Sequence, residues 1–174
     1  NKNKKIKKVL YVPRIYLGDR FIFSLDNYYS DMIYVDWQVR LINLLSSLNY
    51  NIYIKPHPNS YSKFPNNLKN LFNIKFCNNS IEEEIKSADL LIFDHFQSSA
   101  FLSAIKSNIP IVCLNIKEID IKKKAISLIK KRCGYVSCYL DKDNRIKINQ
   151  KNFSRALKES LNLNQNKSFY NYYF

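Results

Sequence analysis

The sequence predicts an α/β domain built around a mainly parallel, doubly wound sheet. Short apolar runs alternate with segments of helical periodicity from Val9 onward, and this alternation is typical of βαβ units. Two of the runs, LLIF at 90–93 and IPIVCL at 109–114, are apolar on both faces, as expected of strands that helices cover on each side. The chain of 174 residues has room for one such domain. We therefore expect a single Rossmann-like, three-layer fold.

Each predicted strand is a short run rich in apolar and β-branched residues. Three of the four cysteines lie in or beside such runs, where Cys behaves as a small buried hydrophobe. The predicted strands are Lys8–Val12, Asn51–Lys55, Ile74–Cys77, Leu90–Asp94, Ile109–Leu114 and Tyr135–Tyr139.

The predicted helices carry apolar stripes at a spacing of three and four residues. The first stripe runs from Trp37 to Leu48, after a possible cap at Asp36. Ser80 and Glu83 match a capping box, which marks the start of another helix. The remaining stripes lie at 101–105, 121–129 and 153–161.

The chain divides into a charged lead-in or linker at 1–8, the Rossmann-like domain at 9–162 and an aromatic tail at 163–174. Because the first residue is Asn1 and the only methionine is Met32, we expect the chain to be a piece of a longer protein. The tail either packs on a partner domain, contacts a membrane or is disordered. The sequence leaves these alternatives open.

A long, tyrosine-rich connection at 13–35 separates the first strand from the first helix. Loops of this length in a compact domain are usually functional or mobile. The connection leaves the carboxyl end of the first strand, where open α/β sheets bind ligands. It is either part of a ligand site or a flap whose aromatic residues pack on the body.

The formal net charge of +14 does not by itself predict nucleic-acid binding. The chain has 22 Lys but only 6 Arg, beside 22 Asn and 21 Ile, and this joint excess is typical of a genome rich in A and T. Direct base readout favours arginine forks. We therefore expect no specific nucleic-acid partner, and a solvated basic surface that tolerates anionic ligands or a membrane surface.

Several common kinds of site are excluded by the residues present. The four cysteines form no CxxC pair and the two histidines no HExxH motif, so we expect no metal and a reduced, cytoplasmic protein. Only Gly18 and Gly134 exist, and neither begins a GxGxxG or Walker pattern. Ser98 and Ser99 lack the flanking glycines of a hydrolase elbow. No apolar run reaches transmembrane length.

The first motif that carries chemistry is Lys55-Pro56-His57-Pro58, at the end of the second strand. Each proline favours an extended predecessor, so the segment holds a defined shape. This places Lys55 and His57 at the carboxyl end of a central strand. A histidine there can donate a hydrogen bond to a phosphate oxygen and stabilise a departing nucleotide. The alternative is a histidine that ties a turn together.

The second motif, DHFQSSA at 94–100, lies where the fourth strand ends and a helix begins. Hydroxyls and backbone N–H groups at a helix N-terminus bind anions, so Gln97, Ser98 and Ser99 are candidate phosphate ligands. A serine here also caps the helix, and both roles are compatible. Asp94 and His95 are either catalytic or part of the strand-end structure.

Together the two motifs resemble the C-terminal, nucleotide-binding domain of GT-B-type transferases. His57-Pro58 closes the second strand, and the serine pair closes the fourth about forty residues later. The nearest groups are bacterial sialyltransferases and polysialyltransferases, capsule Kdo transferases and teichoic-acid glycerophosphotransferases. The run SAFLSAIKSNIPIV at 99–112 is also similar to the unit that follows the serine motif in capsule enzymes.

The resemblance implies one half of a GT-B fold, and a bacterial glycosyltransferase that works in the cytoplasm or at the inner face of the cell membrane. It implies metal-independent, inverting transfer from a nucleotide-activated sugar, with a CMP-linked acidic sugar as the expected donor, to a surface polysaccharide. The acidic base would lie in an N-terminal domain of the same protein. His57 would stabilise the leaving phosphate, with Lys55, Gln97, Ser98 and Ser99 around it.

Two weaker candidates complete the expected pocket: Arg14, at the end of the first strand, and Glu118, beyond the fifth, as a ligand of ribose hydroxyls. One alternative function is glycerophosphate transfer from CDP-glycerol. Another, of a different class, is a non-catalytic basic module that binds nucleotides, nucleic acid or anionic lipid. Binding by such a module would fall steeply with salt and would not require His57.

Overall fold

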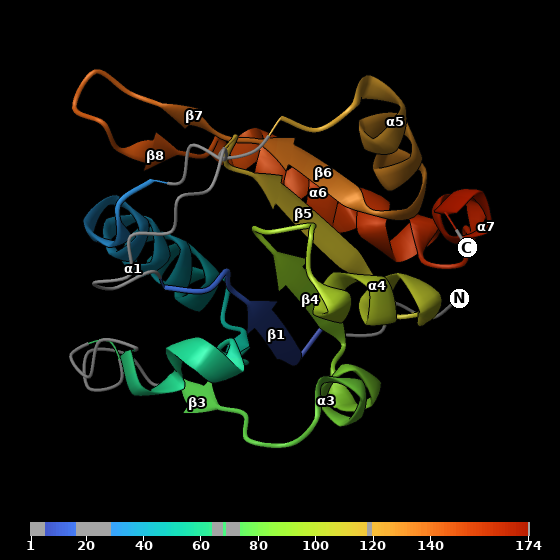
Figure 1. The fold of residues 1–174 in the computed structure, drawn as a ribbon, viewed down its shortest axis with the longest axis horizontal. Helices are drawn as coiled ribbons and strands as arrows, with labels where there is room; N and C mark the ends of the chain where they lie inside the picture. Colours follow the sequence, from blue (N-terminus) through green and yellow to red (C-terminus); the bar gives the residue numbers. More distant parts are fainter. Residues whose placement is uncertain (1–5, 17–28, 64–67, 69–73, 118–119, 174) are drawn as a thin grey trace.

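A six-stranded parallel sheet forms the centre of the domain (Figure 1). The computed structural model describes residues 6–16, 29–63, 68, 74–117 and 120–173. The strand order is β3-β2-β1-β4-β5-β6, and each neighbouring pair is parallel. This order confirms the predicted doubly wound α/β fold. The strands are β1 (Lys8–Val12), β2 (Asn51–Ile54), β3 (Lys75–Phe76), β4 (Leu90–Phe93), β5 (Ile111–Asn115) and β6 (Gly134–Ser137).

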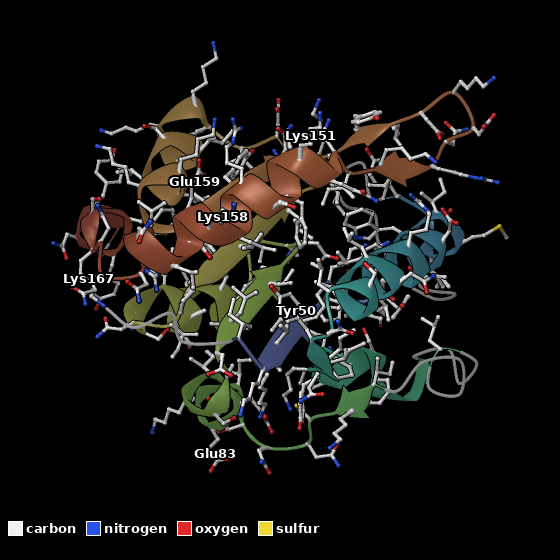
Figure 2. The ribbon with its side chains drawn as sticks, turned by 180° about the vertical axis from the view of Figure 1, so that it is seen from behind. Tyr50, Glu83, Lys151, Lys158, Glu159 and Lys167 are labelled. Atoms are coloured by element: carbon white, nitrogen blue, oxygen red, sulfur yellow. The ribbon has the colours of Figure 1, made fainter. Side chains whose placement is uncertain are left out.

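Helices cover both faces of this sheet, which gives the three layers (Figures 1 and 2). A 3-10 helix, η1 (Pro58–Lys63), follows β2. The α-helices are α1 (Asp31–Ser47), α3 (Ile81–Ser87), α4 (Ser99–Lys106), α5 (Lys123–Arg132), α6 (Gln150–Leu163) and α7 (Ser168–Tyr173).

The alternation of side chains along each strand divides the core into two clusters. Val9 and Tyr11 of β1 pack with residues of α1 and α6 on one face. Leu10 and Val12 pack with residues of α3, α4, α5 and α7 on the other. All four residues of β4 are fully buried, because this central strand has helices on both sides. That is the physical reason for the uninterrupted run LLIF.

The first helix begins earlier than the sequence indicated. Ser30 is its cap, with an Oγ that accepts from the backbone N–H of Ile33, so the predicted cap at Asp36 is wrong. Asp36 lies inside α1 and pairs with Arg40 one turn later, at 2.6 Å. The predicted connection at 13–35 is correspondingly shorter, and its residues 17–28 lie outside the described part of the chain. The predicted capping box at Ser80 is confirmed.

The last strand also ends earlier than predicted. β6 stops at Ser137, and Tyr139–Leu140 (β7) pairs instead with Ile146–Lys147 (β8) in an antiparallel hairpin. Asp141 accepts hydrogen bonds from two backbone N–H groups of the turn, those of Asp143 and Arg145, at 2.9 Å each. Local side-chain bonding of this kind is what aspartate contributes to turns.

The aromatic tail forms a helix that packs on its own domain. Phe169 is buried against the cluster that includes α4 and α5. The ammonium of Lys124 lies 4.0 Å from the ring centre of Tyr172, and that of Lys106 lies 5.2 Å from Tyr170. The tail thus packs on α4 and α5 of its own domain, which none of the three alternatives stated. All four cysteines are buried, free thiols.

Gly134 marks a close approach between β6 and α6. A Cβ atom at this position would lie 2.0 Å from the carbonyl oxygen of Ala156 in α6. Backbone atoms cannot rotate away as a side chain can, so only glycine allows β6 and α6 to pack at this separation.

Gly134→Ala should therefore destabilise the domain by about 1–3 kcal/mol, the usual size of an overpacking strain. The free energy of unfolding from urea titrations measures the effect. Ser137→Ala, at an exposed position of the same strand, is the matched control and should change stability by less than about 0.5 kcal/mol. Equal stability of Gly134→Ala and the unaltered protein would contradict the close packing.

Candidate functional site

The sheet reverses its winding between β1 and β4, and this point defines the candidate site. From β1 the chain continues to α1 on one face, and from β4 it continues to α4 on the other. Open α/β sheets bind ligands outside the carboxyl ends of the strands at such a switch point. Arg14 follows β1 here and Asp94 follows β4.

Asp94 is buried at the switch point and accepts hydrogen bonds from β1, from α1 and from the loop after β1. Its Oδ2 accepts from the hydroxyl of Tyr11 in β1, from the hydroxyl of Tyr34 at 2.7 Å and from Nε1 of Trp37 at 3.2 Å, both in α1. Its Oδ1 accepts from the backbone N–H of Arg14 at 3.2 Å. The carboxylate therefore joins the ends of β1 and β4 to α1.

Burial is the largest influence on the acid–base behaviour of this group. It raises the pKa of Asp94 above the ordinary 3.8, although the hydrogen bonds from Tyr11, Tyr34 and Trp37 and the charge of Arg14 act in the opposite direction. Burial, with the charge of Asp94 next, also raises the pKa values of Tyr11 and Tyr34. Both hydroxyls therefore stay protonated and act as donors.

The sequence predicted Arg14 as a ligand of phosphate, but its side chain lies inside the protein. Its guanidinium donates to the carbonyls of Ile15 and Tyr29, at 2.8 Å each, and stacks 4.0 Å above the ring centre of Tyr34. It also lies 3.6 Å from a carboxylate oxygen of Asp31, and its side chain has no exposed surface. In this arrangement Arg14 supports the loop after β1 from within.

The segment after β2 presents His57 at the surface. Lys55 is half-buried and its Nζ lies 3.4 Å from the carbonyl oxygen of Cys77, whereas His57 is exposed. The Nδ1 atom of His57 accepts a hydrogen bond from the backbone N–H of Asn59 at 3.2 Å. The carbonyl oxygen of His57 accepts one from the backbone N–H of Ser60 at 2.8 Å. In a neutral imidazole whose Nδ1 is an acceptor, Nε2 carries the proton. His57 thus closes a turn and also presents a donor.

The segment after β4 leads directly into α4. Ser98 is the helix cap, and its Oγ accepts from the N–H of Phe101 at 3.1 Å. Ser99 is the first helical residue and is exposed, as is Gln97, while His95 is half-buried. The capping role of Ser98 leaves its hydroxyl proton free to donate elsewhere, because the cap uses only an oxygen lone pair.

The carboxyl ends of β4 and β5 share a small hollow, of about 20 Å³, which is enough for one water molecule. Asn115 and Lys117, which the sequence analysis did not single out, both line it. Lys117 has a φ of 60°, and its N–H donates to Oδ1 of Asn115 at 3.0 Å. A left-handed lysine is uncommon. The only sequence signal that could have found Lys117 as a site residue is its position just after a strongly apolar strand.

The structure thus brings part of the predicted site together. Lys55, His57, Gln97, Ser98 and Ser99 all lie at the carboxyl edge of the sheet, beyond β2 and β4, which flank β1. The Arg14 guanidinium is separated from this surface, and Glu118 falls outside the described residues. Asn115 and Lys117 extend the same edge beyond β5.

Two further findings concern the described residues only. Nowhere in them do three or more His, Cys, Asp or Glu side chains gather closely enough to hold a metal ion. None of their helices combines the length and the apolar character that a membrane crossing requires.

One comparison with known proteins gives a family match. A family model described as LIC12162 family transferase matches residues 2–131. The chain belongs to this transferase family. The matched residues run from the lead-in through β1 to α5 and include every residue of the carboxyl edge named above. No curated protein matches the chain.

The role of Asp94 in this LIC12162-family transferase can be tested through the pH dependence of stability. A carboxyl whose native pKa is raised contributes stability below its unfolded pKa, and that contribution is lost as the pH rises through the native pKa. We subtract the free energy of unfolding of Asp94→Asn from that of the unaltered protein. This difference should fall as the pH rises from 3.8, the ordinary pKa of the group, toward neutral pH, by at most about 1.4 kcal/mol per pH unit.

Urea unfolding of both proteins across this pH range measures the difference, and carboxyls common to the two cancel. A difference that grows as the pH rises would contradict the raised pKa, since it would mean that the ionised carboxylate is the form that the fold prefers.

Proposed function

We propose that this transferase binds the nucleotide of an activated sugar donor at the carboxyl edge of its sheet and transfers the sugar to a growing surface glycan. The observation that carries the proposal is the placement of two elements with donor groups suited to phosphate on either side of the switch strand β1. One is the exposed imidazole of His57 after β2, and the other is the capped start of α4 after β4.

His57 is proposed as the residue that stabilises the leaving phosphate. Its Nδ1 is held by the N–H of Asn59, so the proton on Nε2 is available to a ligand. Pro56 and Pro58 restrict the backbone on both sides of the histidine. A donor that is fixed before the reaction stabilises developing negative charge without reorganising.

The start of α4 is proposed to hold the remaining phosphate oxygens. The first backbone N–H groups of a helix have no partner within it, and they carry the positive end of the helix dipole. Ser99 and Ala100 supply such N–H groups, and the hydroxyl of Ser98 adds a donor. The exposed ammonium of Lys117 contributes positive charge from beyond β5.

In the proposed reaction the acceptor hydroxyl attacks the anomeric carbon of the donor sugar, and the bond from that carbon to the phosphate oxygen breaks. The electron pair of that bond leaves with the nucleotide, where His57 and the α4 start receive the charge. The acceptor proton passes to a base that we assign to an N-terminal domain, following the resemblance to GT-B enzymes. No metal is required for these steps.

The preferred donor is a CMP-linked acidic sugar, because the paired histidine and serine motifs resemble those of sialyltransferase-like enzymes. CDP-glycerol is the alternative within the same edge, and it differs by one phosphate. A basic module without catalytic function would instead bind polyanions through many surface lysines, with affinity that depends steeply on salt.

Calorimetric titration of the chain with CMP, CDP, UDP and GDP tests the proposal, beside two His57 variants. The amide of Asn reproduces the position of Nδ1, and that of Gln reproduces Nε2. His57→Asn should therefore keep the turn but weaken cytidine-nucleotide binding by about tenfold or more, whereas His57→Gln should retain much of it.

Tight CMP binding relative to CDP would support the sugar donor, and the reverse would favour CDP-glycerol. Equal binding by all four nucleotides that is insensitive to both His57 variants and falls steeply with salt would overturn the proposal in favour of the basic module.

Lys117 offers a second test because its backbone favours glycine. With a φ of 60°, Lys117→Gly should leave stability unchanged or raise it by up to about 1 kcal/mol. The same variant should weaken nucleotide binding roughly tenfold through loss of the ammonium. Asn49→Gly is the matched control, since Asn49 also has a positive φ, of 59°, but precedes β2 at the opposite edge.

Thermal unfolding and calorimetry of the two glycine variants provide the readouts. Unchanged nucleotide affinity in Lys117→Gly would remove this lysine from the site.

A further inference from the structure

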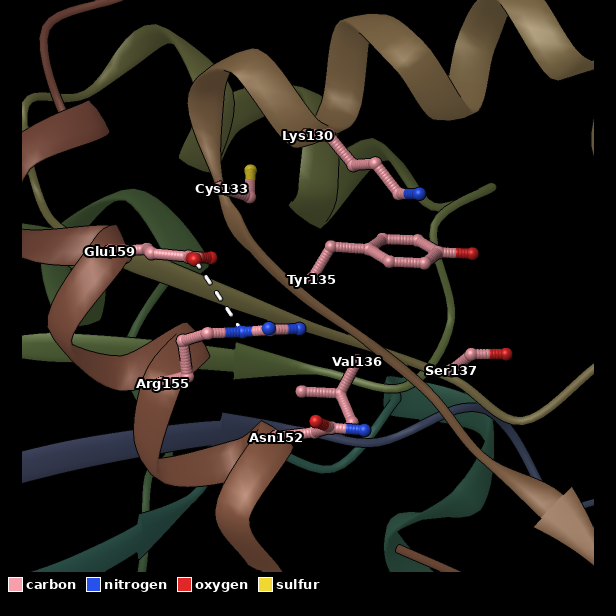
Figure 3. A pocket seen from close by; sticks show the side chains of 8 residues that line it. All are labelled: Lys130, Cys133, Tyr135, Val136, Ser137, Asn152, Arg155 and Glu159. Atoms are coloured by element: carbon pink, nitrogen blue, oxygen red, sulfur yellow. Dashed lines mark ion pairs between the residues drawn. The ribbon is translucent and has the colours of Figure 1, made fainter. Parts of the chain in front are cut away.

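A second cavity lies away from the carboxyl edge, along the outer side of β6. It has a volume of about 330 Å³ and lies between the end of α5, the strand β6 and the first turns of α6 (Figure 3). Tyr135 and Ser137 of β6 line it, with Lys130 from α5 and Asn152 and Arg155 from α6. Figure 3 shows the strand passing between the two helices, with Lys130 and Arg155 on either side of it.

The strand at the base of this cavity has an open edge. β6 is the last strand of the sheet, and its one strand neighbour among the described residues is β5. The N–H of Cys138 donates to Asn115 of β5 at 2.8 Å, so by alternation the main-chain groups of Val136 also point toward β5. Those of Tyr135 and Ser137 then point into the cavity, ready to bond to a further strand.

The opposite edge of the sheet is much less suited to strand addition. β3 has only two residues, one of which is an exposed lysine, and short charged edges are a common protection against pairing. β6 has four residues and carries neither a charge nor a proline. The open edge of β6 is therefore the better suited of the two to strand addition.

The charged side chains at the sides of the cavity indicate which charge an added strand would carry. Lys130 Nζ lies 5.0 Å from the ring centre of Tyr135 and is exposed. Arg155 Nε lies 3.7 Å from a carboxylate oxygen of Glu159, and both side chains are at least half exposed. This exposed pair is weak, so the guanidinium can also bind a carboxylate of an occupant. The positive charges of Lys130 and Arg155 outnumber the one negative charge of Glu159 in the lining, which favours an acidic occupant.

We propose that an extended, acidic peptide segment of a partner protein binds along β6 by strand addition. Its main chain would bond to the outward N–H and C=O groups of Tyr135 and Ser137, and its carboxylates would lie between Lys130 and Arg155. A second copy of this chain fits less well, because the same cations would meet across the interface and each chain carries a formal charge of +14. The inference is independent of the proposed donor site.

The test uses a fluorescent, acetylated eight-residue peptide in which threonine alternates with glutamate. Fluorescence anisotropy with the full chain should give saturable binding. A peptide of the same sequence with N-methylated backbone amides should bind at least about tenfold more weakly, because it cannot form the ladder. In amide hydrogen exchange, bound peptide should slow exchange at Tyr135 and Ser137 and leave Val136 unchanged, since its N–H already faces β5.

Charge reversal at the cavity provides the variant and its control. Lys130→Glu with Arg155→Glu should weaken peptide binding at least about tenfold. Lys151→Glu with Lys158→Glu makes the same change of net charge at two exposed positions of α6 that do not line the cavity (Figure 2), and should leave binding within about twofold.

Four results would overturn the proposal. The first is no binding up to about 1 mM peptide, a weak affinity even for transient recognition, and the second is equal binding of the N-methylated peptide. The third is an equal loss of binding in both double variants, and the fourth is a dimer in sedimentation that the peptide does not dissociate. The second and third would indicate diffuse charge attraction, and the fourth would indicate that a second copy occupies the edge.

Discussion

The buried carboxylate of Asp94 is the constraint on which the arrangement of the carboxyl edge depends. It receives donors from Tyr11 in β1, from Tyr34 and Trp37 in α1 and from the backbone at Arg14. A buried carboxylate without these donors would be strongly unfavourable, so the ends of two strands and one helix are stable only when assembled together. The same donors hold the start of the connection between β1 and α1, where the switch point lies.

The groups proposed to act on a ligand are placed around this buried centre by backbone constraints. Prolines flank His57, a helix cap fixes Ser98, and an Asn115 side chain holds the left-handed turn at Lys117. The backbone of each of the three is fixed, and the imidazole of His57 and the hydroxyl of Ser98 are also held by hydrogen bonds to backbone N–H groups. A site built this way keeps its donors aligned before the ligand arrives, which is what electrostatic stabilisation of a leaving phosphate requires.

The carboxyl edge and the cavity along β6 share a structural connection. Asn115 donates to the hydroxyl of Tyr135 at 2.6 Å and accepts from the N–H of Lys117 at 3.0 Å. The ring of Tyr135 lines the cavity, while Asn115 and Lys117 line the hollow between β4 and β5. The two regions are therefore joined by the hydrogen bonds of Asn115 at the β5–β6 side of the sheet, although we propose different ligands for them.

The fold class and the positions of the central strands follow from the sequence alone, because runs such as LLIF are apolar on both faces only where helices cover both sides. The sequence also located the motifs of His57 and Ser98 at strand ends. The direction in which each polar side chain points was visible only in the folded structure. Asp94 meets Tyr34 across 60 residues of chain, and Arg14 is enclosed by carbonyls and an aromatic ring. A strand-end position fixes the backbone of a residue, but the direction of its side chain depends on neighbours that are distant in sequence.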